Sequence, residues 1–452
     1  MLELDYTNIL DTAVGAAHGI PKIAFEKMDS SSKHLIADLE TARAAGNLGF
    51  ADVPFDDETT LAVARFAKDR AFPAVLVIGI GGSALGPAAL DAALGRPNSG
   101  KRLVVLDNID PDFVRDTLDT LVPEDTIVNV IAKSGVTAET MSTFGVVHRW
   151  MTGALGGRAK EHFAVTTDPE KGDLLQIARQ EKYPVFAIPP NVGGRFSVLT
   201  PVGTLPAALL GLNVHELMEG AKRAAIQSQK PFLENPAMAA AFIQFVLERD
   251  RQKKMLVLFP YSQALWKFAF WFKQLWGESL GKKVDRRGRD VYYGQTPTAA
   301  LGVTDQHSQL QLFIEGPNDK SFLLWAVREF RDPVSIEHAF ATFDSMAYLQ
   351  NKTMAELFQA ERQATEIALT EASRPNATVW MDRINEDSMG ELFMFSQYLT
   401  AYAGELYDIN AFDQPGVEYG KKLTFALMGR DGFSEYNRKI DDIRKRDRAV
   451  IK

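Results

Sequence analysis

Apolar residues in the first half of the chain gather in short runs that alternate with segments of helical spacing. Five β-branched runs, AVLVIGI, RLVVLDN, TIVNVIA, HFAVTTD and YPVFAIP, lie between residues 74 and 189. Such runs predict strands, whereas the intervening segments, such as PAALDAALG and DLLQIARQEK, repeat their apolar positions at the period of a helix. The alternation predicts an α/β fold with a parallel sheet covered on both faces, in which ligands bind beyond the carboxyl ends of the strands.

The second half shows a looser version of the same pattern. Strands are expected at KMLVLFP, QLQLFIEG and FLLWAV, and between the first two lies ALWKFAFWFKQLWGESLG, which reads as an amphipathic, aromatic-rich helix that ends at Gly281. The first fifty residues have helix-like spacing, and the closing segment DDIRKRDRAVIK resembles a charged surface helix. We detect no internal repeat and no low-complexity tract.

A chain of 452 residues is too long for one ordinary core, which favours two α/β domains with terminal extensions and a cleft between the domains. The pattern places a helical N-terminal arm at 1–50, a first α/β domain at 51–205, a second at 206–395, and a C-terminal helical segment at 396–452.

Composition narrows the classes of function. The net charge of −8 disfavours nucleic acid as a partner, and the absence of cysteine excludes disulfides, a thiolate nucleophile and cysteine-ligated metal. The apolar runs are too short to cross a bilayer, and the first residues do not resemble a secretory signal, so no membrane partner is expected and the cytoplasm is the expected location. An anionic ligand would need local amides, hydroxyls and a few placed cations.

Two strand-to-helix turns have the composition of anion sites. The first, VIGIGGSALGP, holds Gly79, Gly81, Gly82, Ser83 and Gly86, and the second, VIAKSGVTAET, holds Lys133, Ser134, Gly135, Thr137 and Thr140. Amides and hydroxyls at a helix start suit a phosphate group. The glycine spacing departs from the dinucleotide fingerprint, and no Walker lysine follows. A tight turn and an ordinary Ser/Thr helix cap remain the plainer alternatives for the two segments.

A glycine-rich turn and an aromatic helix carry the residues for acid–base chemistry. In NVGGRFSVLTPVG, Gly193 and Gly194 precede Arg195, which is either a surface ion-pair partner or a fixed charge for a developing oxyanion. In KQLWGESLGKK, Gln274 and Glu278 share one helix face. A helical glutamate is usually solvated, but one placed among aromatic residues would suit a general base.

Two further segments contain polar residues that are candidates for an active site. In TDQHSQLQLF, His307 precedes an expected strand, and its commonest fate is structural; FDQPGVEYGKKL holds Gln414, Gly416, Glu418 and Lys421 beyond a turn. The seven histidines are scattered without a metal-ligand spacing, so no metal and no cofactor are expected. There is also no G-x-S-x-G elbow of a serine hydrolase.

Taken in order, these segments resemble the glucose-6-phosphate isomerase family, in its shorter bacterial form. GGRFS and FDQPGVEYGK resemble its most characteristic segments, and GIGGSALGP, AKSGVTAET, GESLGK and QHSQ resemble the others. The resemblance implies two sugar isomerase (SIS) domains, each a flavodoxin-like α/β/α sandwich with a parallel sheet. It also implies terminal helices that wrap onto a homodimer, and interconversion of glucose 6-phosphate and fructose 6-phosphate in glycolysis and gluconeogenesis.

The resemblance also implies roles for individual residues. Glu278 would move a proton between C2 and C1 through a cis-enediol, Arg195 would steady the enediolate, and His307, from the neighbouring subunit, would open the sugar ring together with Lys421. The implied substrate-binding residues are Gly82, Ser83, Lys133, Ser134, Thr137, Gly194, Gln274 and Gln414. Ala132 and Val136 stand where many relatives carry hydroxyl residues, which bears on phosphate affinity.

Other functions remain open at this point. An isomerase for another hexose 6-phosphate, such as mannose 6-phosphate, would use the same chemistry. A non-catalytic SIS protein would need the phosphate-binding turns but not Glu278, His307, Arg195 and Lys421 together. A glutamine-dependent sugar-phosphate synthase would normally need an N-terminal cysteine nucleophile, and this chain has no cysteine.

Overall fold

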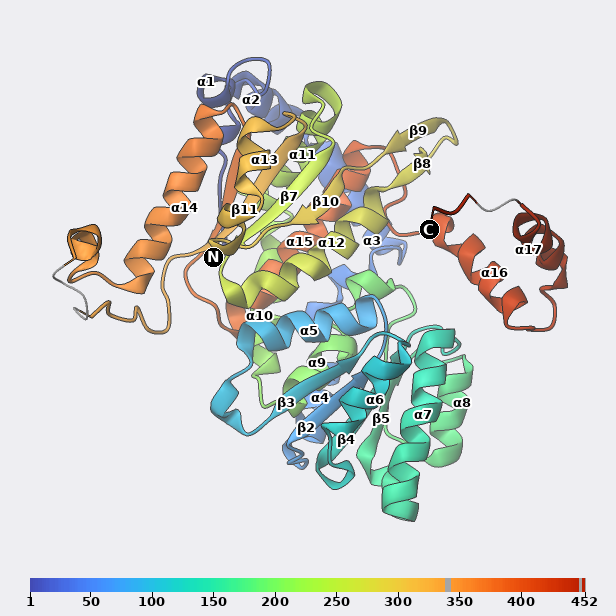
Figure 1. The fold of residues 1–452 in the computed structure, drawn as a ribbon. Helices are drawn as coiled ribbons and strands as arrows, with labels where there is room; N and C mark the ends of the chain where they lie inside the picture. The colour runs from blue at the N-terminus through green and yellow to red at the C-terminus, as the bar shows by residue number, and fades with distance from the viewer. Residues whose placement is uncertain (338–342, 447–448, 452) are drawn as a thin grey trace. The chain divides into compact units, whose positions relative to one another are not determined.

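The structure, a computed structural model, describes residues 1–337, 343–446 and 449–451. The chain divides into two compact units, Met1–Asn410 and Ala411–Lys452. The larger unit contains two sheets built mainly of parallel strands, with helices on both faces of each (Figure 1). The α/β class is therefore confirmed.

The first sheet consists of five parallel strands in the order β3-β2-β4-β5-β6. Its strands are β2 (Ala74–Ile78), β3 (Arg102–Leu106), β4 (Thr126–Ala132), β5 (Phe163–Thr167) and β6 (Val185–Ala187). All five runs predicted from the sequence are strands. The order is that of flavodoxin-like sheets, in which the second strand lies on one side of the first and the third on the other.

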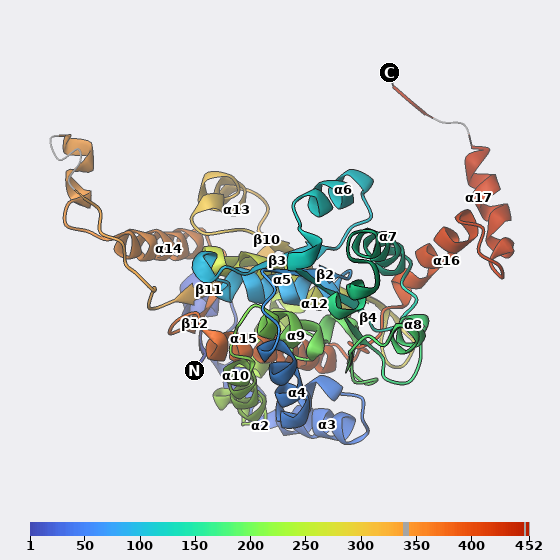
Figure 2. The ribbon, with the colours of Figure 1, turned by 90° about the horizontal axis from the view of Figure 1, so that it is seen from below.

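Helices cover both faces of the first sheet (Figure 2). On one face, α6 (Pro111–Asp119), α7 (Ala138–Leu155) and α8 (Asp173–Glu181) pack on side chains such as Leu76 and Val128. On the other face, α9 (Pro201–Leu209) contributes Val202, which packs with Val77 and Ile131. The helices α4 (Asp57–Lys68) and α5 (Gly82–Leu94) pack on α9. Burial of side chains on both faces explains why these strands are mostly apolar. Two of their buried polar residues meet across the sheet, where Thr166 Oγ1 donates a hydrogen bond to Asn129 Oδ1 at 3.0 Å.

The second sheet repeats the arrangement with one difference. Its parallel strands β7 (Met255–Tyr261), β10 (Thr296–Ala299), β11 (Lys320–Val327) and β12 (Asn376–Met381) are joined at the β12 edge by β1 (Glu3–Asp5), which runs antiparallel. The predicted strands at KMLVLFP and FLLWAV are confirmed as β7 and β11. The predicted strand at QLQLFIEG is wrong, because Leu310–Glu315 forms the helix α13.

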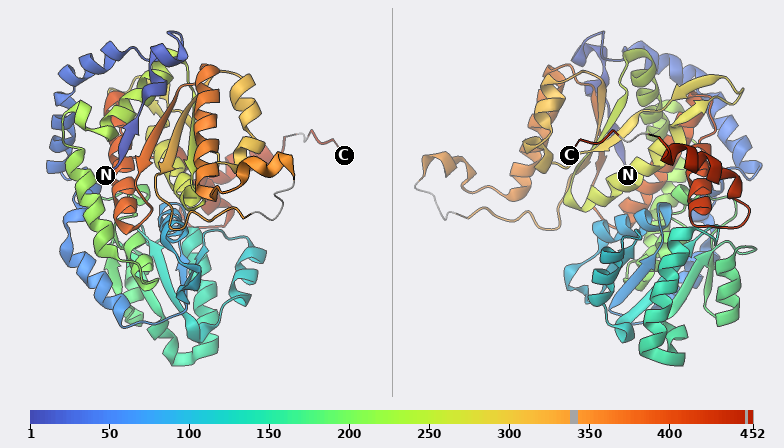
Figure 3. Two further views of the ribbon diagram at one scale, coloured as in Figure 1. Left: turned by 90° about the vertical axis from the view of Figure 1, so that its left-hand side faces the viewer. Right: turned by 45° about the vertical axis from the view of Figure 1, so that its right-hand side comes forward.

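Aromatic side chains fill the core on one face of this sheet. The predicted helix is α12 (Trp266–Leu280), and its Phe268 and Phe272 rings contact Trp325 of β11 edge to face, with centroids 4.8 Å and 5.5 Å away. Helix α15 (Glu386–Leu406) adds Phe393, 5.4 Å from Phe268. The opposite face is covered by α13 and α14 (Met354–Glu371) (Figure 3). Helix α12 is therefore a core helix rather than a surface one.

The N-terminal fifty residues contain α1 (Asp11–Val14), α2 (Lys22–Ser31) and α3 (Lys33–Ala44) in addition to β1. Among the described residues of the larger unit, the remaining α-helices and strands are α10 (Val214–Gln227), α11 (Pro236–Arg251) and the antiparallel pair β8 (Lys282–Val284) and β9 (Asp290–Tyr293). The smaller unit contains α16 (Glu418–Leu427) and α17 (Asn437–Arg444). The four-part division expected from the sequence stays a prediction, and α9 and α15 run through two of its boundaries.

Candidate active site

The glycine-rich turn after β2 lies directly against the turn that carries Arg195. Gly81 adopts φ +57°, a conformation that favours glycine, and α5 begins at Gly82. A Cβ added at Gly82 would lie 2.0 Å from the carbonyl oxygen of Gly194 and 2.9 Å from the amide nitrogen of Arg195. Only glycine allows this approach, so the VIGIGGSALGP turn and the NVGGRFSVLTPVG turn form one continuous backbone surface.

The guanidinium group of Arg195 is buried and held by α12. Its Nε donates a hydrogen bond to Ser279 Oγ at 2.7 Å, and its Nη1 lies 3.6 Å from Glu278 Oε2. The side chain of Arg195 is 3% exposed and that of Glu278 is 35% exposed. The cation is thus fixed at the base of the site, while the carboxylate keeps access to solvent and to a ligand.

Helix α12 also brings Gln274 into the site. Gln274 Nε2 lies 3.5 Å from Glu278 Oε2, and a Cβ added at Gly81 would come within 2.9 Å of Gln274 Nε2. The Oε1 atom of Gln274 is buried without a hydrogen-bond partner in the described part of the chain. The i, i+4 spacing predicted a shared helix face, and the structure confirms it.

The second phosphate motif follows β4. Ser134 Oγ and Thr137 Oγ1 lie 3.1 Å apart just before α7, where helix-start amides favour an anion. Lys133 instead donates to the carbonyl oxygens of Pro190 at 2.8 Å and Val192 at 2.7 Å, and burial lowers the pKa of its ammonium group. Lys133 therefore ties the β4 loop to the segment that leads into Arg195, and its contact with a substrate stays a prediction.

His307 is exposed at the end of a short 3-10 helix, Thr304–His307, just before α13. Within the described ranges, its side chain forms no hydrogen bond or ion pair with the residues of the larger unit. The neighbouring Gln306 donates to Glu361 of α14 at 3.1 Å, which anchors the turn. His307 is thus displayed on the surface rather than held in the core, and its role stays a prediction.

Gln414 and Lys421 belong to the smaller unit. Lys421 lies on α16, where its ammonium group is 2.8 Å from Glu418 Oε1 and both side chains are about half exposed. The part that these two residues play in the site stays a prediction.

Sequence reasoning missed the residues that position the reacting groups. Ser279, which orients Arg195, follows Glu278 directly and is buried. The only hint in the sequence was a small polar residue next to the candidate base. Lys282 donates to the carbonyl oxygen of Glu278 at 2.8 Å and so secures the end of α12. Neither contact can be seen from sequence spacing, because each depends on how the helix end packs.

The arrangement has the components of proton-transfer chemistry. A partly exposed carboxylate can act as a base, a buried guanidinium beside it can stabilise an oxyanion, and the amides and hydroxyls of the two turns can hold a phosphate group. Among residues 1–337, 343–446 and 449–451, no three His, Asp or Glu side chains gather in a way that could hold a metal ion. No helix in the same ranges is long and apolar enough to cross a membrane.

Comparisons with a family profile and with individual proteins identify the same family. The family profile described as phosphoglucose isomerase matches residues 66–441. A glucose-6-phosphate isomerase from Carboxydothermus hydrogenoformans is 46% identical over 430 residues, which cover 92% of each chain. One from Rubrobacter xylanophilus is 43% identical over 384 residues, which cover 83% of this chain and 87% of the relative.

Two solved structures share the fold. A hypothetical protein from Thermus thermophilus matches with a TM-score of 0.87 and 38% identity, covering 95% of this chain and 100% of the other. A glucose-6-phosphate isomerase from Chlamydia trachomatis matches with a TM-score of 0.83 and 20% identity, covering 98% of this chain and 92% of the other. At that identity the second likeness concerns the fold alone.

Proposed function

The chain belongs to the phosphoglucose isomerase family, and from this premise we propose that it interconverts glucose 6-phosphate and fructose 6-phosphate. The observation that carries the proposal is the pair formed by Glu278 and Arg195, 3.6 Å apart beside the glycine turn of the first sheet. Proton transfer next to a carbonyl group needs one carboxylate and one oxyanion stabiliser, and this pair supplies both.

In the proposed reaction, the substrate phosphate lies at the carboxyl ends of β2 and β4. The amides after Gly81 and the hydroxyls of Ser83, Ser134 and Thr137 bind it, and this remote contact supplies binding energy and orientation. Gln274 contacts the sugar near the reacting carbons, and its unpaired Oε1 atom is free to accept a hydroxyl hydrogen. The sugar chain then extends from the phosphate towards α12.

Glu278 acts as the base on the open-chain sugar. Its carboxylate removes the proton from C2, and the Arg195 guanidinium group stabilises the resulting cis-enediolate. The carbon-bound proton returns to C1 while the proton of the O2 hydroxyl passes to O1, so that C1 becomes the CH2OH carbon and C2 the carbonyl carbon of the ketose. The reverse sequence gives the aldose. Because Arg195 is buried and held by Ser279, its charge is already in place before the enediolate forms, so little reorganisation is needed.

We further propose that the protein acts as a homodimer in the cytoplasm, with His307 supplied to the site of the neighbouring subunit. His307 is exposed, as a residue donated across an interface must be in one protomer. Apolar side chains are also exposed on the segment between β11 and α14, including Val334, Phe343, Met346 and Tyr348. Figure 1 shows the described part of this segment projecting away from the second sheet. Lys421 would assist His307 in ring opening.

The first experiment measures turnover of fructose 6-phosphate in a coupled assay with excess EDTA. We expect rapid turnover by the native protein and a loss of at least about 10³-fold in Glu278→Gln, because the amide cannot accept the proton. Calorimetry should show that this variant still binds the sugar phosphate. Glu371→Gln, an exposed glutamate at the end of α14, serves as the matched control and should retain full activity.

Two results would contradict the proposal. Normal turnover in Glu278→Gln would remove the proposed base. Sugar-phosphate binding by the native protein without any turnover would instead favour a protein that senses sugar phosphates.

A further inference from the structure

In each of the two sheets the strand order changes direction once, between two neighbouring strands. The proposed active site lies at this position in the first sheet only. In the first sheet the reversal lies between β2 and β4, whose carboxyl ends carry the two phosphate motifs. In the second sheet, β10 lies on one side of β7 and β11 on the other, so the reversal lies between β7 and β11. Ligands of open α/β sheets bind in the crevice beyond such a point.

A cavity of about 700 Å³ lies at this second reversal point. Its walls come from residues that follow β7, β11 and β12 and from the end of α5. The residues used below are Ser262, Trp266, Lys267, Glu329, Phe330, Arg331 and Arg383. Cavities of this size hold metabolites or drug-sized molecules.

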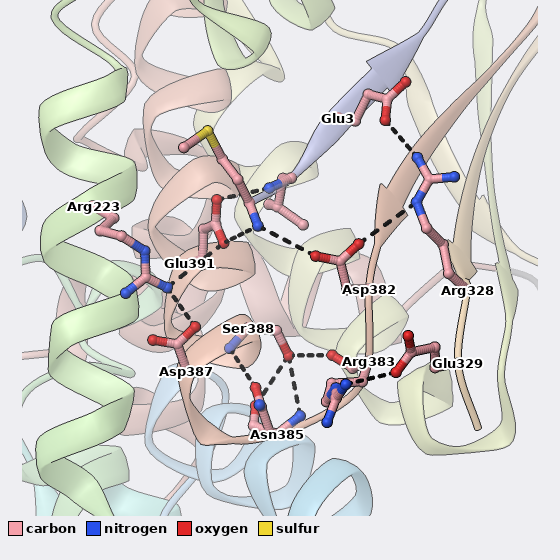
Figure 4. A network of polar contacts seen from close by, with 12 residues as sticks. Glu3, Arg223, Arg328, Glu329, Asp382, Arg383, Asn385, Asp387, Ser388 and Glu391 are labelled. Atoms are coloured by element: carbon pink, nitrogen blue, oxygen red, sulfur yellow. Dashed lines mark hydrogen bonds and ion pairs between the residues drawn. The ribbon is translucent and has the colours of Figure 1, made fainter. Parts of the chain in front are cut away.

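The charges that line the cavity favour an anion. Arg383 Nη2 lies 2.6 Å from Glu329 Oε2, so these two charges compensate each other (Figure 4). Lys267 and Arg331 form no ion pair within the described part of the chain, and Arg331 donates only to the carbonyl oxygen of Ala93 at 3.3 Å. The lining therefore has two uncompensated positive charges, which match one phosphate dianion.

The mostly buried residue Ser262 provides a separate indication. Ser262 is 8% exposed and lines the cavity, yet its hydroxyl has no hydrogen-bond partner among the described residues. It directly precedes the turn that opens α12, and the amides at a helix start favour negative charge. The hydroxyl is therefore open to the cavity, where it and the helix start can bind an external acceptor.

We propose that this cavity binds a small phosphorylated metabolite with a planar ring, of the class of a nucleoside monophosphate. The phosphate contacts Ser262, Lys267 and Arg331, and the ring lies against the partly exposed side chains of Trp266 and Phe330. The site is distinct from the catalytic one, because Trp266 and Glu278 are twelve residues apart on α12, about 18 Å along the helix axis. Since α12 joins both sites, bound ligand stabilises the helix that carries Glu278 and Gln274.

The test is calorimetric titration of the full-length protein with adenosine monophosphate and, separately, with inorganic phosphate. We expect saturable binding of the nucleotide, weakened at least about tenfold when Lys267→Ala and Arg331→Ala are combined, because each removes a charged hydrogen bond. Ser262→Ala should weaken it less. Lys273→Ala is the matched control, since it removes a charge from α12 outside the cavity and should leave affinity within about twofold.

A second pair of variants separates the two sites. Ser134→Ala combined with Thr137→Ala should weaken fructose 6-phosphate binding and leave nucleotide binding intact, whereas the Lys267/Arg331 variant should keep the native KM for fructose 6-phosphate. The proposal is overturned if the Ser134/Thr137 variant loses nucleotide binding, which would place the nucleotide at the first sheet. It is equally overturned if the Lys267/Arg331 variant binds normally, or if neither probe binds saturably.

Discussion

At the scale of single residues, the candidate site depends on close contacts that leave no room for added atoms. Gly82 packs on the Gly194 carbonyl, and Arg195 is held between Ser279 and Glu278. In both cases a residue from the first α/β region meets one from a distant segment. A change of one methyl group or one hydrogen bond at these positions should therefore affect activity before it affects the fold.

The variant Gly82→Ala should cause a large loss of activity. The new Cβ would lie 2.0 Å from the Gly194 oxygen, so the turn that carries Arg195 must shift. A shift of about 1 Å in a catalytic group costs roughly 100-fold in rate, and we expect a loss of that size in kcat/KM for fructose 6-phosphate. Gly145→Ala is the control, because nothing lies within 4 Å of its added Cβ. Equal activity of the two variants would contradict this account.

Asp91 on α5 should make stability depend on pH. Burial raises the pKa of its carboxyl from 3.8 to about 6. Well below pH 3.8 the carboxyl is protonated in both the folded and the unfolded state, so it does not change the free energy of unfolding. As the pH rises above 3.8, ionisation is easier in the unfolded state, and the folded protein is destabilised. This destabilisation reaches its full size above about pH 6. Asp91→Asn removes this cost.

We therefore expect Asp91→Asn to raise the Tm at pH 8 by at least about 2 °C and to approach the native Tm near pH 4. Thermal unfolding followed by circular dichroism measures both values. Asp116→Asn, an exposed aspartate on α6, should show no such difference. An equal Tm gain for Asp91→Asn at both pH values would mean that the ionised carboxylate is not the cause.

At the scale of elements, α12 connects the core to the chemistry. Its Phe268, Phe272 and Trp276 side chains are buried, while Gln274 and Glu278 lie on the face towards the first sheet. The sequence predicted that this segment is a helix with many aromatic residues. It could not predict that these aromatic side chains are buried, because their burial depends on contacts with α15 and β11. This packing gives Glu278 a rigid support.

Helices α10 and α15 cross at a contact that requires glycine from each. A Cβ added at Gly390 would lie 1.8 Å from the Leu217 carbonyl oxygen, and one added at Gly220 would lie 1.8 Å from the Asp387 oxygen. We expect Gly390→Ala to lower the free energy of unfolding by about 3 kcal/mol, because the helices must move apart. Urea unfolding measures this change. Gly145→Ala should stabilise its helix or leave it unchanged, and similar midpoints for both variants would refute the steric explanation.

Short elements were the hardest to predict. QLQLFIEG alternates apolar and polar residues as a strand does, yet α13 spans only Leu310–Glu315 and buries Phe313 on the second sheet. The strand β10 contains Pro297, and β12 begins with the polar Asn376, so neither stood out. In segments this short, tertiary packing outweighs the local pattern.

At the scale of the whole molecule, the proposal of a shared site predicts complementation between inactive variants. If His307 serves the neighbouring subunit, mixed dimers of His307→Ala and Glu278→Gln contain one intact site out of two. Random exchange puts half of the chains in mixed dimers, so about a quarter of native activity should return. Exchange is checked with two affinity tags. If tags exchange and activity does not return, His307 acts within its own chain or not at all.

The exposed apolar segment between β11 and α14 gives a second molecular prediction. Phe343→Ser together with Tyr348→Ser should shift the protein from dimer to monomer, because these exposed rings would lose apolar contact with the partner. Sedimentation velocity measures the change. The same substitutions at Phe55 and Tyr292, which are exposed elsewhere, should leave the mass unchanged. A native protein that sediments as a monomer would contradict the dimer itself.

The sequence by itself determined the α/β class and the five strands of the first sheet, and it singled out Gly82, Arg195 and Glu278, which the structure brings together. Those features are local: β-branched runs specify strands, and glycines and hydroxyls after strands are typical of turns that can bind anions. The six motifs were also sufficient to show the family resemblance. The roles of His307, Gln414 and Lys421 rest on that resemblance.

Only the tertiary structure decided how these motifs meet. Arg195 and Ser279 are 84 residues apart in the sequence, yet their side chains form a hydrogen bond of 2.7 Å. They meet because α5 packs on α12 and because the backbone of Gly194 and Arg195 lies directly against Gly82 at the start of α5. The cavity at the second sheet likewise joins residues after three strands with the end of α5. Such distances depend on the packing of whole elements, which no local pattern records, and that is why the sequence could single out Arg195 and Glu278 but not show how they meet.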